Sequence, residues 1–231
     1  MNSNDFMHTP DFRKHFVNFV QADTLMPLRS VSSQWKATAT QFINEGVESG
    51  LMMVHDGKDI SSHESNSRRT IERKRNVTEV LFLLNVTRVG DFACCDAAKL
   101  VVVDLPEGVE IVGGHAFYYC RSLTAVSFPA TLKKIGLYAF GNCPNLDNVE
   151  LLHTSLQEIG EQAFWGCSEL KLMTLPESLR TLGANCFREC FNLEPSNILH
   201  PESKTSKIIA DITAYLRTQP AFTEDYLNPE Y

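Results

Sequence analysis

One pattern recurs along the chain from residue 89 to residue 193 and constrains its fold more than any other feature. Each copy has a glycine near its start and a leucine at its end: VGDFACCDAAKL (89–100), VGGHAFYYCRSL (112–123), IGLYAFGNCPNL (135–146), IGEQAFWGCSEL (159–170) and LGANCFRECFNL (182–193). The interval between final leucines is constant, except for a single insertion between Leu146 and Leu170. Units of this length cannot bury an apolar side alone, so the period predicts a solenoid of stacked coils.

A short stretch with alternating apolar residues follows each of the first four leucines and predicts a strand. The apolar pairs are Val103 and Leu105, Val126 and Phe128, Val149 and Leu151, and Met173 and Leu175. A partial strand, EVLFL (79–83), precedes the first unit, with Val80 and Phe82 at the matching positions. The last strand, EPSNI (194–198), has Ser196 where an apolar residue belongs. Departures of this kind are expected in terminal repeats.

The repeat predicts the layout of each coil. The strands form a parallel sheet on one side, and the segment from the glycine to the cysteine supplies a short helical turn behind it, which makes an α/β repeat. The repeat glycines are expected where the backbone turns tightly. The phenylalanines of successive units form an aromatic spine in the core: Phe117, Phe140, Phe164 and Phe187. Tyr118 and Trp165, which follow two of them, are expected on the convex side.

These residues resemble the BspA-type leucine-rich repeat, whose pattern includes IG..AF..C..L..V.LP. The resemblance covers residues 78–199, about half of the chain. It implies a right-handed leucine-rich-repeat solenoid of about five 23-residue units that binds other macromolecules and carries no catalytic site. Many members of the family are surface or secreted proteins. This chain shows no signal-peptide pattern in its first residues, so we expect a cytoplasmic or nuclear protein.

The seven cysteines could indicate a metal site, redox chemistry or disulfides, and the repeat favours a packing role. Four of them share one repeat position and predict a ladder of small buried groups: Cys120, Cys143, Cys167 and Cys190. Cys186 and Cys94 replace the alanine and the phenylalanine of their units, and Cys95 is expected to be the most exposed. In a reducing compartment all seven are expected to be thiols.

The first part of the chain, residues 1–54, predicts a helical segment with Phe12, Phe16 and Phe19 on one face. Its residues 23–39 resemble the second half of an F-box, although the usual opening of that motif is missing. The matching residues are Asp23, Leu25, Leu28, Arg29, Val31, Ser32 and Trp35. The resemblance implies docking on a Skp-type adaptor through Leu25, Leu28, Val31 and Trp35. The alternative is a helical cap on the solenoid.

The remaining segments are assigned by composition and periodicity. Residues 55–77 are polar and serine-rich, which predicts a linker or loop before the solenoid at 78–199. Residues 200–231 predict a cap helix and a tail. The helix has one apolar face: Ile208, Ile209, Ile212, Tyr215 and Leu216.

The sequence favours no catalytic or cofactor chemistry. It contains no phosphate-binding loop, nucleophile elbow or metalloprotease motif, and its histidines share no ligand spacing. We therefore expect a non-enzyme with no catalytic residue, metal, cofactor or small-molecule substrate. A net charge of −7 argues against a nucleic-acid partner, and no apolar run is long enough to span a membrane.

Function is therefore expected to lie on a surface. The strand residues between the apolar positions point outward on the concave face: Glu79, Leu81, Val102, Asp104, Ala125, Ser127, Asn148, Glu150, Leu172 and Thr174. They combine acidic and apolar side chains, which suits a protein or peptide partner with basic and apolar features. The leading hypothesis is a non-catalytic protein-interaction module. The alternative is an F-box-type substrate receptor of a ubiquitin ligase.

Overall fold

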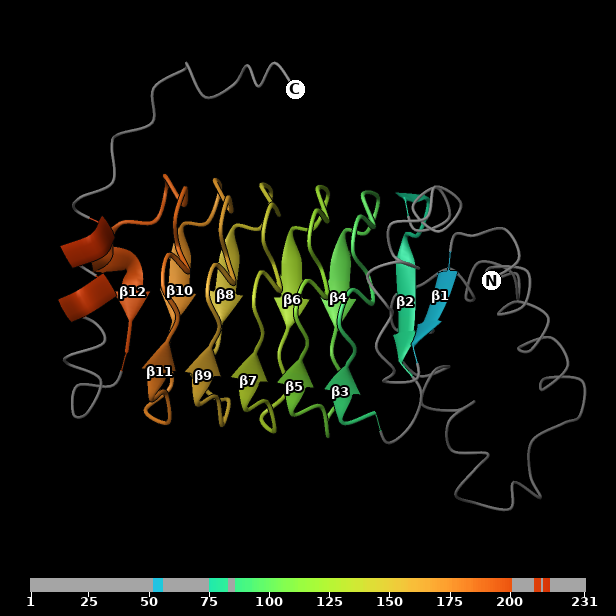
Figure 1. The fold of residues 1–231 in the computed structure, drawn as a ribbon, viewed down its shortest axis with the longest axis horizontal. Helices are drawn as coiled ribbons and strands as arrows, with labels where there is room; N and C mark the ends of the chain where they lie inside the picture. The colour runs from blue at the N-terminus through green and yellow to red at the C-terminus, as the bar shows by residue number, and fades with distance from the viewer. Residues whose placement is uncertain (1–51, 56–74, 83–85, 201–209, 213, 217–231) are drawn as a thin grey trace, which may run out of the picture.

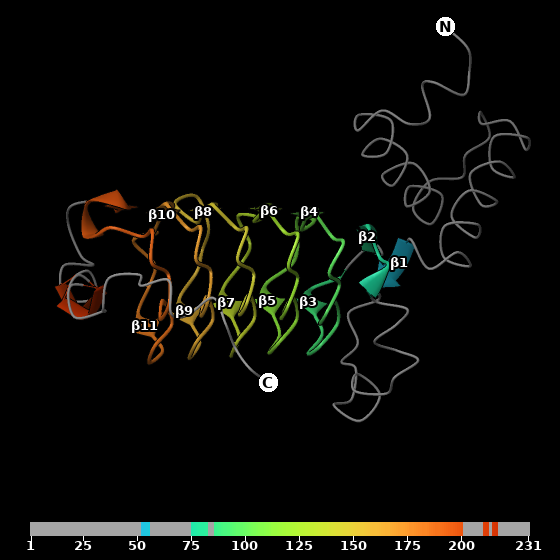
Figure 2. The ribbon, with the colours of Figure 1, turned by 90° about the horizontal axis from the view of Figure 1, so that it is seen from above.

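The computed structural model describes residues 52–55, 75–82, 86–200, 210–212 and 214–216. It shows coils of the chain stacked side by side along one axis (Figure 1). Each full coil contributes a strand to each of two rows, and Figure 2 shows these rows on opposite sides of the stack. The predicted leucine-rich-repeat solenoid is therefore confirmed, and its strands pair with the period found in the sequence.

The first row contains the strands that the sequence predicts, together with β1, which it does not predict. They are β1 (Met52–His55), β2 (Glu79–Phe82), β4 (Val102–Asp104), β6 (Ala125–Ser127), β8 (Asn148–Glu150), β10 (Leu172–Thr174) and β12 (Ile198–Leu199). All pairings in this row are parallel, with β1 beside β2, β4 beside β6, and β10 between β8 and β12. The register follows the repeat, since Val103 lies opposite Val126 and Val149 lies opposite Met173.

The second row was not predicted. It is a five-stranded parallel sheet of two-residue strands: β3 (Arg88–Val89), β5 (Ile111–Val112), β7 (Lys134–Ile135), β9 (Glu158–Ile159) and β11 (Thr181–Leu182). In the first four strands the apolar residue directly before the repeat glycine is fully buried. A strand of two residues is too short to show alternation, so only pairing between coils reveals it.

The segment after each repeat glycine is a run of turns, and the expected helical turn is wrong. Within one coil, Ala93 N–H donates to the Gly90 carbonyl, whereas Phe92 N–H donates to the Gly114 carbonyl of the next coil. Successive backbone N–H groups thus donate alternately to carbonyls of their own coil and to carbonyls of the next coil. An α-helix would instead direct these donors to carbonyls four residues earlier. Left-handed residues such as His115 (φ 55°) and Tyr119 (φ 61°) also interrupt helical geometry.

The repeat glycines are required by close stacking rather than by the backbone conformation that was expected. A Cβ added at Gly136 would lie 2.7 Å from the carbonyl carbon of Gly113. A Cβ at Gly160 would lie 2.6 Å from the carbonyl carbon of Gly136. Each glycine therefore lies against the backbone of the previous coil, where no side chain fits. Non-glycine residues such as Tyr138 and Asn142 adopt the left-handed turns instead.

The core contains the predicted aromatic spine. The rings of Phe117, Phe140, Phe164 and Phe187 stack with centroid separations of 5.2, 5.5 and 5.9 Å. All four side chains are fully buried, as are the repeat leucines from Leu100 to Leu170. The spine begins at Phe117 because the preceding unit has Cys94 at this position.

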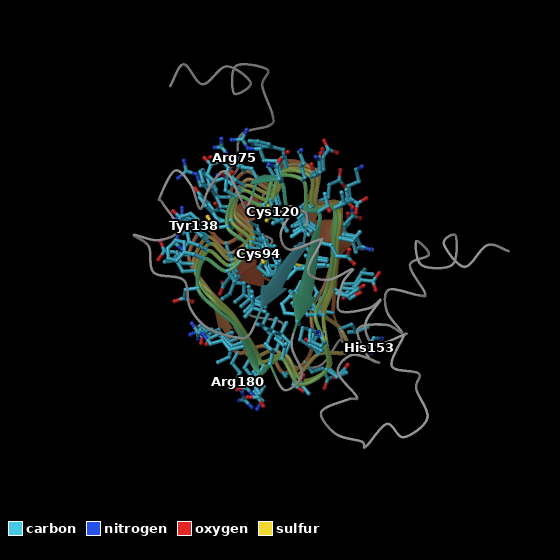
Figure 3. The ribbon with its side chains drawn as sticks, turned by 90° about the vertical axis from the view of Figure 1, so that its right-hand side faces the viewer. Arg75, Cys94, Cys120, Tyr138, His153 and Arg180 are labelled. Atoms are coloured by element: carbon cyan, nitrogen blue, oxygen red, sulfur yellow. The ribbon has the colours of Figure 1, made fainter. Side chains whose placement is uncertain are left out.

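The cysteine ladder is also present. Each ladder thiol donates to the carbonyl at the phenylalanine position of the previous coil, as in Cys143 to Phe117 (3.1 Å) and Cys167 to Phe140 (3.2 Å). Burial raises the pKa of Cys167 to about 12. All seven cysteines are free, and Cys95 is the one that is not fully buried. Figure 3 shows Cys94 and Cys120 inside the solenoid.

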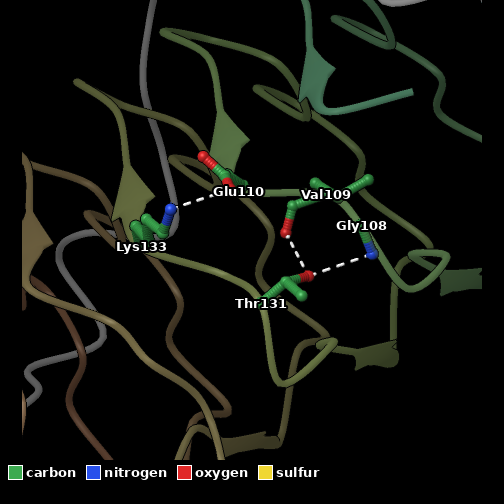
Figure 4. Close-up of polar contacts among 5 residues, drawn as sticks. All are labelled: Gly108, Val109, Glu110, Thr131 and Lys133. Carbon is green, nitrogen blue, oxygen red and sulfur yellow. Dashed lines mark hydrogen bonds and ion pairs between the residues drawn. The ribbon is translucent and has the colours of Figure 1, made fainter. Parts of the chain in front are cut away.

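Polar contacts join neighbouring coils at the edge of the second sheet (Figure 4). The Thr131 hydroxyl accepts from the Gly108 N–H and donates to the Val109 carbonyl, both at 3.0 Å. Lys133 pairs with Glu110 at 2.7 Å across the same two coils. The hydroxyl therefore satisfies backbone groups between short strands, while the exposed ion pair contributes at most about 1 kcal/mol.

The C-terminal end departs from the predicted register. A 3₁₀ turn, Pro195–Asn197, lengthens the connection, so that Ile198 rather than Ser196 lies opposite Met173 and is buried. The described residues at 210–212 and 214–216 are helical, as predicted, and Ile212 is buried in the core. Figure 1 shows this helix beside β12.

At the N-terminal end, β1 occupies residues predicted to end a helical segment and begin a linker. Met52–His55 are extended because they pair with β2, a partner so distant in the chain that local periodicity does not reveal it. The rest of the predicted segments at 1–54 and 55–77, except the described residues 75–77, lies outside the described residues.

Removal of one spine ring should destabilise the whole stack. We expect Phe140→Ala to lower the free energy of unfolding by about 3–5 kcal/mol, because the cavity would lie between two stacked rings. Leu137→Ala, at a side chain that is 43% exposed, is the control and should change it by about 0.5 kcal/mol or less. Urea unfolding followed by circular dichroism measures both. A Phe140 effect as small as that of the control would contradict the assigned core.

The buried thiols predict a loss of stability at alkaline pH. Burial holds Cys167 neutral in the fold to about pH 12, against about pH 9 in the unfolded chain. Its contribution is therefore complete below about pH 9 and is lost as the pH rises toward 12, because only the unfolded state releases the proton. The stability difference between the parent and Cys167→Ala, measured by urea unfolding with reductant, should shrink across this window. Val149→Ala removes no ionisable group, so its stability difference from the parent should not change across the same pH window.

Candidate functional site

The predicted binding residues lie together on one surface, the strand face, formed by the outward side chains of β2, β4, β6, β8 and β10. Val102, Asp104, Ala125, Ser127 and Glu150 are exposed, whereas Glu79, Asn148, Leu172 and Thr174 are half-buried. The side chain of Leu81 lies outside the described part. Parallel strands in a common register place equivalent residues of successive coils in rows.

Some strand-face residues already have partners within the fold. The Thr174 hydroxyl accepts from the N–H groups of Leu151 (2.9 Å) and Leu152 (3.0 Å), so it joins two coils. The Asn148 amide donates to the Glu150 carboxylate at 3.1 Å and orients it. The Asn148 carbonyl oxygen is buried and has no hydrogen-bond partner in the described part of the chain. Thr174 is thus a structural residue, and Asn148 and Glu150 act as one polar unit.

The strand face is acidic with exposed apolar positions. Asp147 is exposed and adds an acid that the strand pattern did not predict. Lys171, on the next coil, lies 3.6 Å from the Glu169 carboxylate. Val101 and Val102 are 47% and 50% exposed and form an apolar patch next to the acids. Val101 and Asp147 directly follow repeat leucines, a position that the strand signature leaves unassigned.

A second surface, the turn face, is formed by outward side chains of the segments after the repeat glycines. Figure 3, a view along the solenoid, places Tyr138 and His153 on opposite sides. Six rings on this face contact one another and form what we call the turn-face aromatic cluster: Phe92, His115, Tyr118, Tyr119, Tyr138 and Trp165. Sequence analysis expected Tyr118 and Trp165 on the outside but did not predict the cluster.

The cluster is built from a stacked row and a second row at steep angles to it. The His115 ring stacks between Phe92 at 4.7 Å and Tyr138 at 5.1 Å. Tyr118 and Trp165 meet the Tyr138 ring edge to face at 5.7 and 5.9 Å. These rings belong to successive repeats of the chain and meet only because the coils stack.

Burial favours the neutral form of two rings in the cluster, His115 and Tyr118. Burial lowers the pKa of His115, and the nearby Asp91 charge only partly opposes this effect. Burial raises the pKa of Tyr118 to about 12, although its hydroxyl accepts a hydrogen bond from the Asn142 amide at 3.4 Å. A positive charge touches the edge of the cluster, where the Arg121 guanidinium lies 5.2 Å from the Tyr119 ring centre.

Among the described residues, no group of three or more histidine, cysteine or acidic side chains could hold a metal ion. No helix in this part is long and apolar enough to cross a membrane. The predicted adaptor-binding residues Leu25, Leu28, Val31 and Trp35 lie outside the described residues.

Comparison with solved structures finds several leucine-rich-repeat proteins. A Treponema pallidum leucine-rich-repeat protein is 35% identical, with 47% of this chain matched to 50% of that one and a TM-score of 0.46. A leucine-rich cell-surface protein of Faecalibacterium prausnitzii is 24% identical, with 55% matched to 32% and a TM-score of 0.48. A Bacteroides ovatus leucine-rich-repeat protein is 25% identical, with 52% matched to 42% and a TM-score of 0.39. The chain thus spans half or less of each of these proteins.

Comparison with curated proteins finds no match. The model of the BspA-type leucine-rich-repeat region matches residues 87–209 in six copies, which is slightly more than half of the 231-residue chain. The match covers the strands from β3 to β12, the repeat glycines and the buried phenylalanines described above. The chain therefore belongs to the BspA-type leucine-rich-repeat family.

Proposed function

We propose that this chain is a non-catalytic module that binds a protein or peptide through its strand face. The observation that carries the proposal is the row of exposed side chains that the strand register places on one surface, including Val102, Asp104 and Glu150. None of these strand positions is needed to fill the core, because Val103, Val149 and Met173 do so from the opposite side of the strands.

The chemistry of the strand face defines the partner class. Glu79, Asp104, Asp147 and Glu150 supply negative charge, and Val101 and Val102 supply apolar area. A partner with basic side chains beside an apolar anchor complements this arrangement, because opposite charges speed and orient the encounter while apolar burial slows dissociation. An elongated solenoid also offers such a partner a long surface at regular spacing.

Charge reversal on the strand face tests the proposal once a partner has been captured from lysate and identified. We expect Asp104→Lys and Glu150→Lys each to weaken binding about fivefold or more at low salt, with a smaller effect at high salt. Glu161→Lys makes the same charge change on the turn face and should leave affinity nearly unchanged. Isothermal titration measures affinity, and circular dichroism confirms folding. Unchanged binding in both strand-face variants would contradict the proposal.

The F-box-like pattern at residues 23–39 supports a second proposal, in which the chain links its partner to a Skp-type adaptor. Leu25, Leu28 and Trp35 would supply the apolar contacts. The purified chain should then retain the adaptor in a pull-down, and Trp35→Ala should abolish retention while Asp104→Lys preserves it. If the folded chain binds the strand-face partner but not the adaptor, the adaptor-binding role is excluded and the strand-face proposal is unaffected.

A further inference from the structure

The turn-face aromatic cluster contributes no residue to the strand face. Its rings are half-buried and come from four successive coils, whereas the spine phenylalanines already fill the core. Leu137, next to Tyr138, adds an exposed apolar side chain to the same face. Tyrosine and tryptophan are enriched at binding hot spots, and the outward residues of the strand face contain neither. The cluster therefore has the composition of a separate binding surface.

Two rings of the cluster stand at the same repeat position two coils apart. Tyr118 and Trp165 occupy the same repeat position in the second and fourth units, and Gly141 occupies it in the third. Two carbon atoms of the Tyr118 ring lie 2.9 and 3.0 Å from the point where a Cβ on Gly141 would be. The ring thus leans over the glycine, and the Tyr138 ring lies at 77° and 84° to Tyr118 and Trp165. An aromatic ring, a buried glycine that this ring covers, and a second aromatic ring therefore follow one another.

The two-coil separation between Tyr118 and Trp165 matches the length of one turn of a polyproline II helix. Parallel strands lie about 4.8 Å apart, so equivalent positions two coils apart are separated by roughly 9.6 Å. A polyproline II helix has three residues per turn and rises about 3.1 Å per residue, which gives roughly 9.3 Å per turn. A segment in this conformation that runs along the solenoid axis would place residues i and i+3 over Tyr118 and Trp165.

The polar groups of the cluster suit the same ligand. A polyproline II backbone makes no internal hydrogen bonds, so its carbonyls need donors from the surface that binds it. The Tyr118 hydroxyl accepts from the Asn142 amide and carries an O–H of its own, and the Trp165 indole N–H has no hydrogen-bond partner among the described residues. That N–H is covered in the free protein, so a small rotation of the indole ring must accompany its donation to a ligand carbonyl. Asn142 and Gln162 near the rings carry no charge, and the Arg121 guanidinium lies against the Tyr119 ring at the edge of the cluster.

We propose that the turn face binds a proline-rich segment of a partner protein in the polyproline II conformation, with prolines three residues apart seated beside Tyr118 and Trp165. Aromatic-lined surfaces recognise such segments because the ligand is already extended and loses little conformational entropy on binding. This surface lies apart from the strand face, so the two can bind different partners or two segments of one partner.

Fluorescence polarisation of labelled peptides with the full chain tests the proposal. A peptide with prolines at every third residue should bind at least about fivefold more tightly than one of equal length with prolines at every fourth residue, and a glycine–serine peptide should not bind. Tyr118→Ala and Trp165→Ala should each weaken binding about tenfold or more. Trp165→Phe and Tyr118→Phe keep a ring for packing and remove one donor, so they should weaken binding less while the chain stays folded.

Controls separate this surface from the strand face and from other ligands. Asp104→Lys should leave peptide affinity unchanged, and a loss equal to that of Tyr118→Phe would overturn the assignment to the turn face. Absence of binding to the three-residue-spaced peptide by the folded chain would also overturn the proposal, as would equal affinity for both proline spacings. Tighter binding of an arginine-rich peptide or of cellohexaose to the same residues would replace the proline-rich partner with a cationic or carbohydrate ligand.

Discussion

The close approach of successive coils is the constraint on which the rest of this structure depends. A Cβ at Gly136 or Gly160 would lie within 2.7 Å of the previous coil's backbone, so a side chain at this position would force the coils apart. The same spacing lets the spine rings stack at 5.2–5.9 Å and lets each ladder thiol reach a carbonyl of the previous coil. The repeat glycines, the stacked phenylalanines and the ladder cysteines therefore all depend on the same short separation between successive coils.

The cysteines illustrate how a repeat changes the meaning of a residue. A single unit, with Phe140 and Cys143 in one short stretch, could be taken for part of a metal or redox site. In the stack, each ladder cysteine instead acts as a small core residue with one weak donor that bonds to a carbonyl of the previous coil, as Cys143 does to the Phe117 carbonyl, which also accepts from the Cys120 N–H. Burial holds Cys143 and Cys167 in the thiol form, which is unreactive.

The two outer surfaces differ because one side of each coil is a strand and the other is a run of turns. Strands alternate strictly, so each inward residue such as Val149 leaves Asn148 and Glu150 pointing outward, and these can vary without loss of core. The turns expose a backbone that bonds to its neighbours at every second residue. Side chains such as Tyr118 cover part of that backbone, most clearly over Gly141. An acidic, partly apolar surface and an aromatic surface thus coexist on one solenoid.

The sequence by itself determined the period, the positions of the strands β4, β6, β8 and β10, the buried phenylalanines and leucines, and the rows of the strand face, because each of these follows from which positions of the repeat are apolar. Only the tertiary structure decided the rest. Four features depend on which residues face each other across coils. They are the two-residue strands such as Ile111–Val112, the position of Ile198 rather than Ser196 opposite Met173, the pairing of Met52–His55 with β2, and the hydrogen bonds of Thr174. The aromatic cluster depends on the same contacts, since rings from successive repeats touch only after stacking.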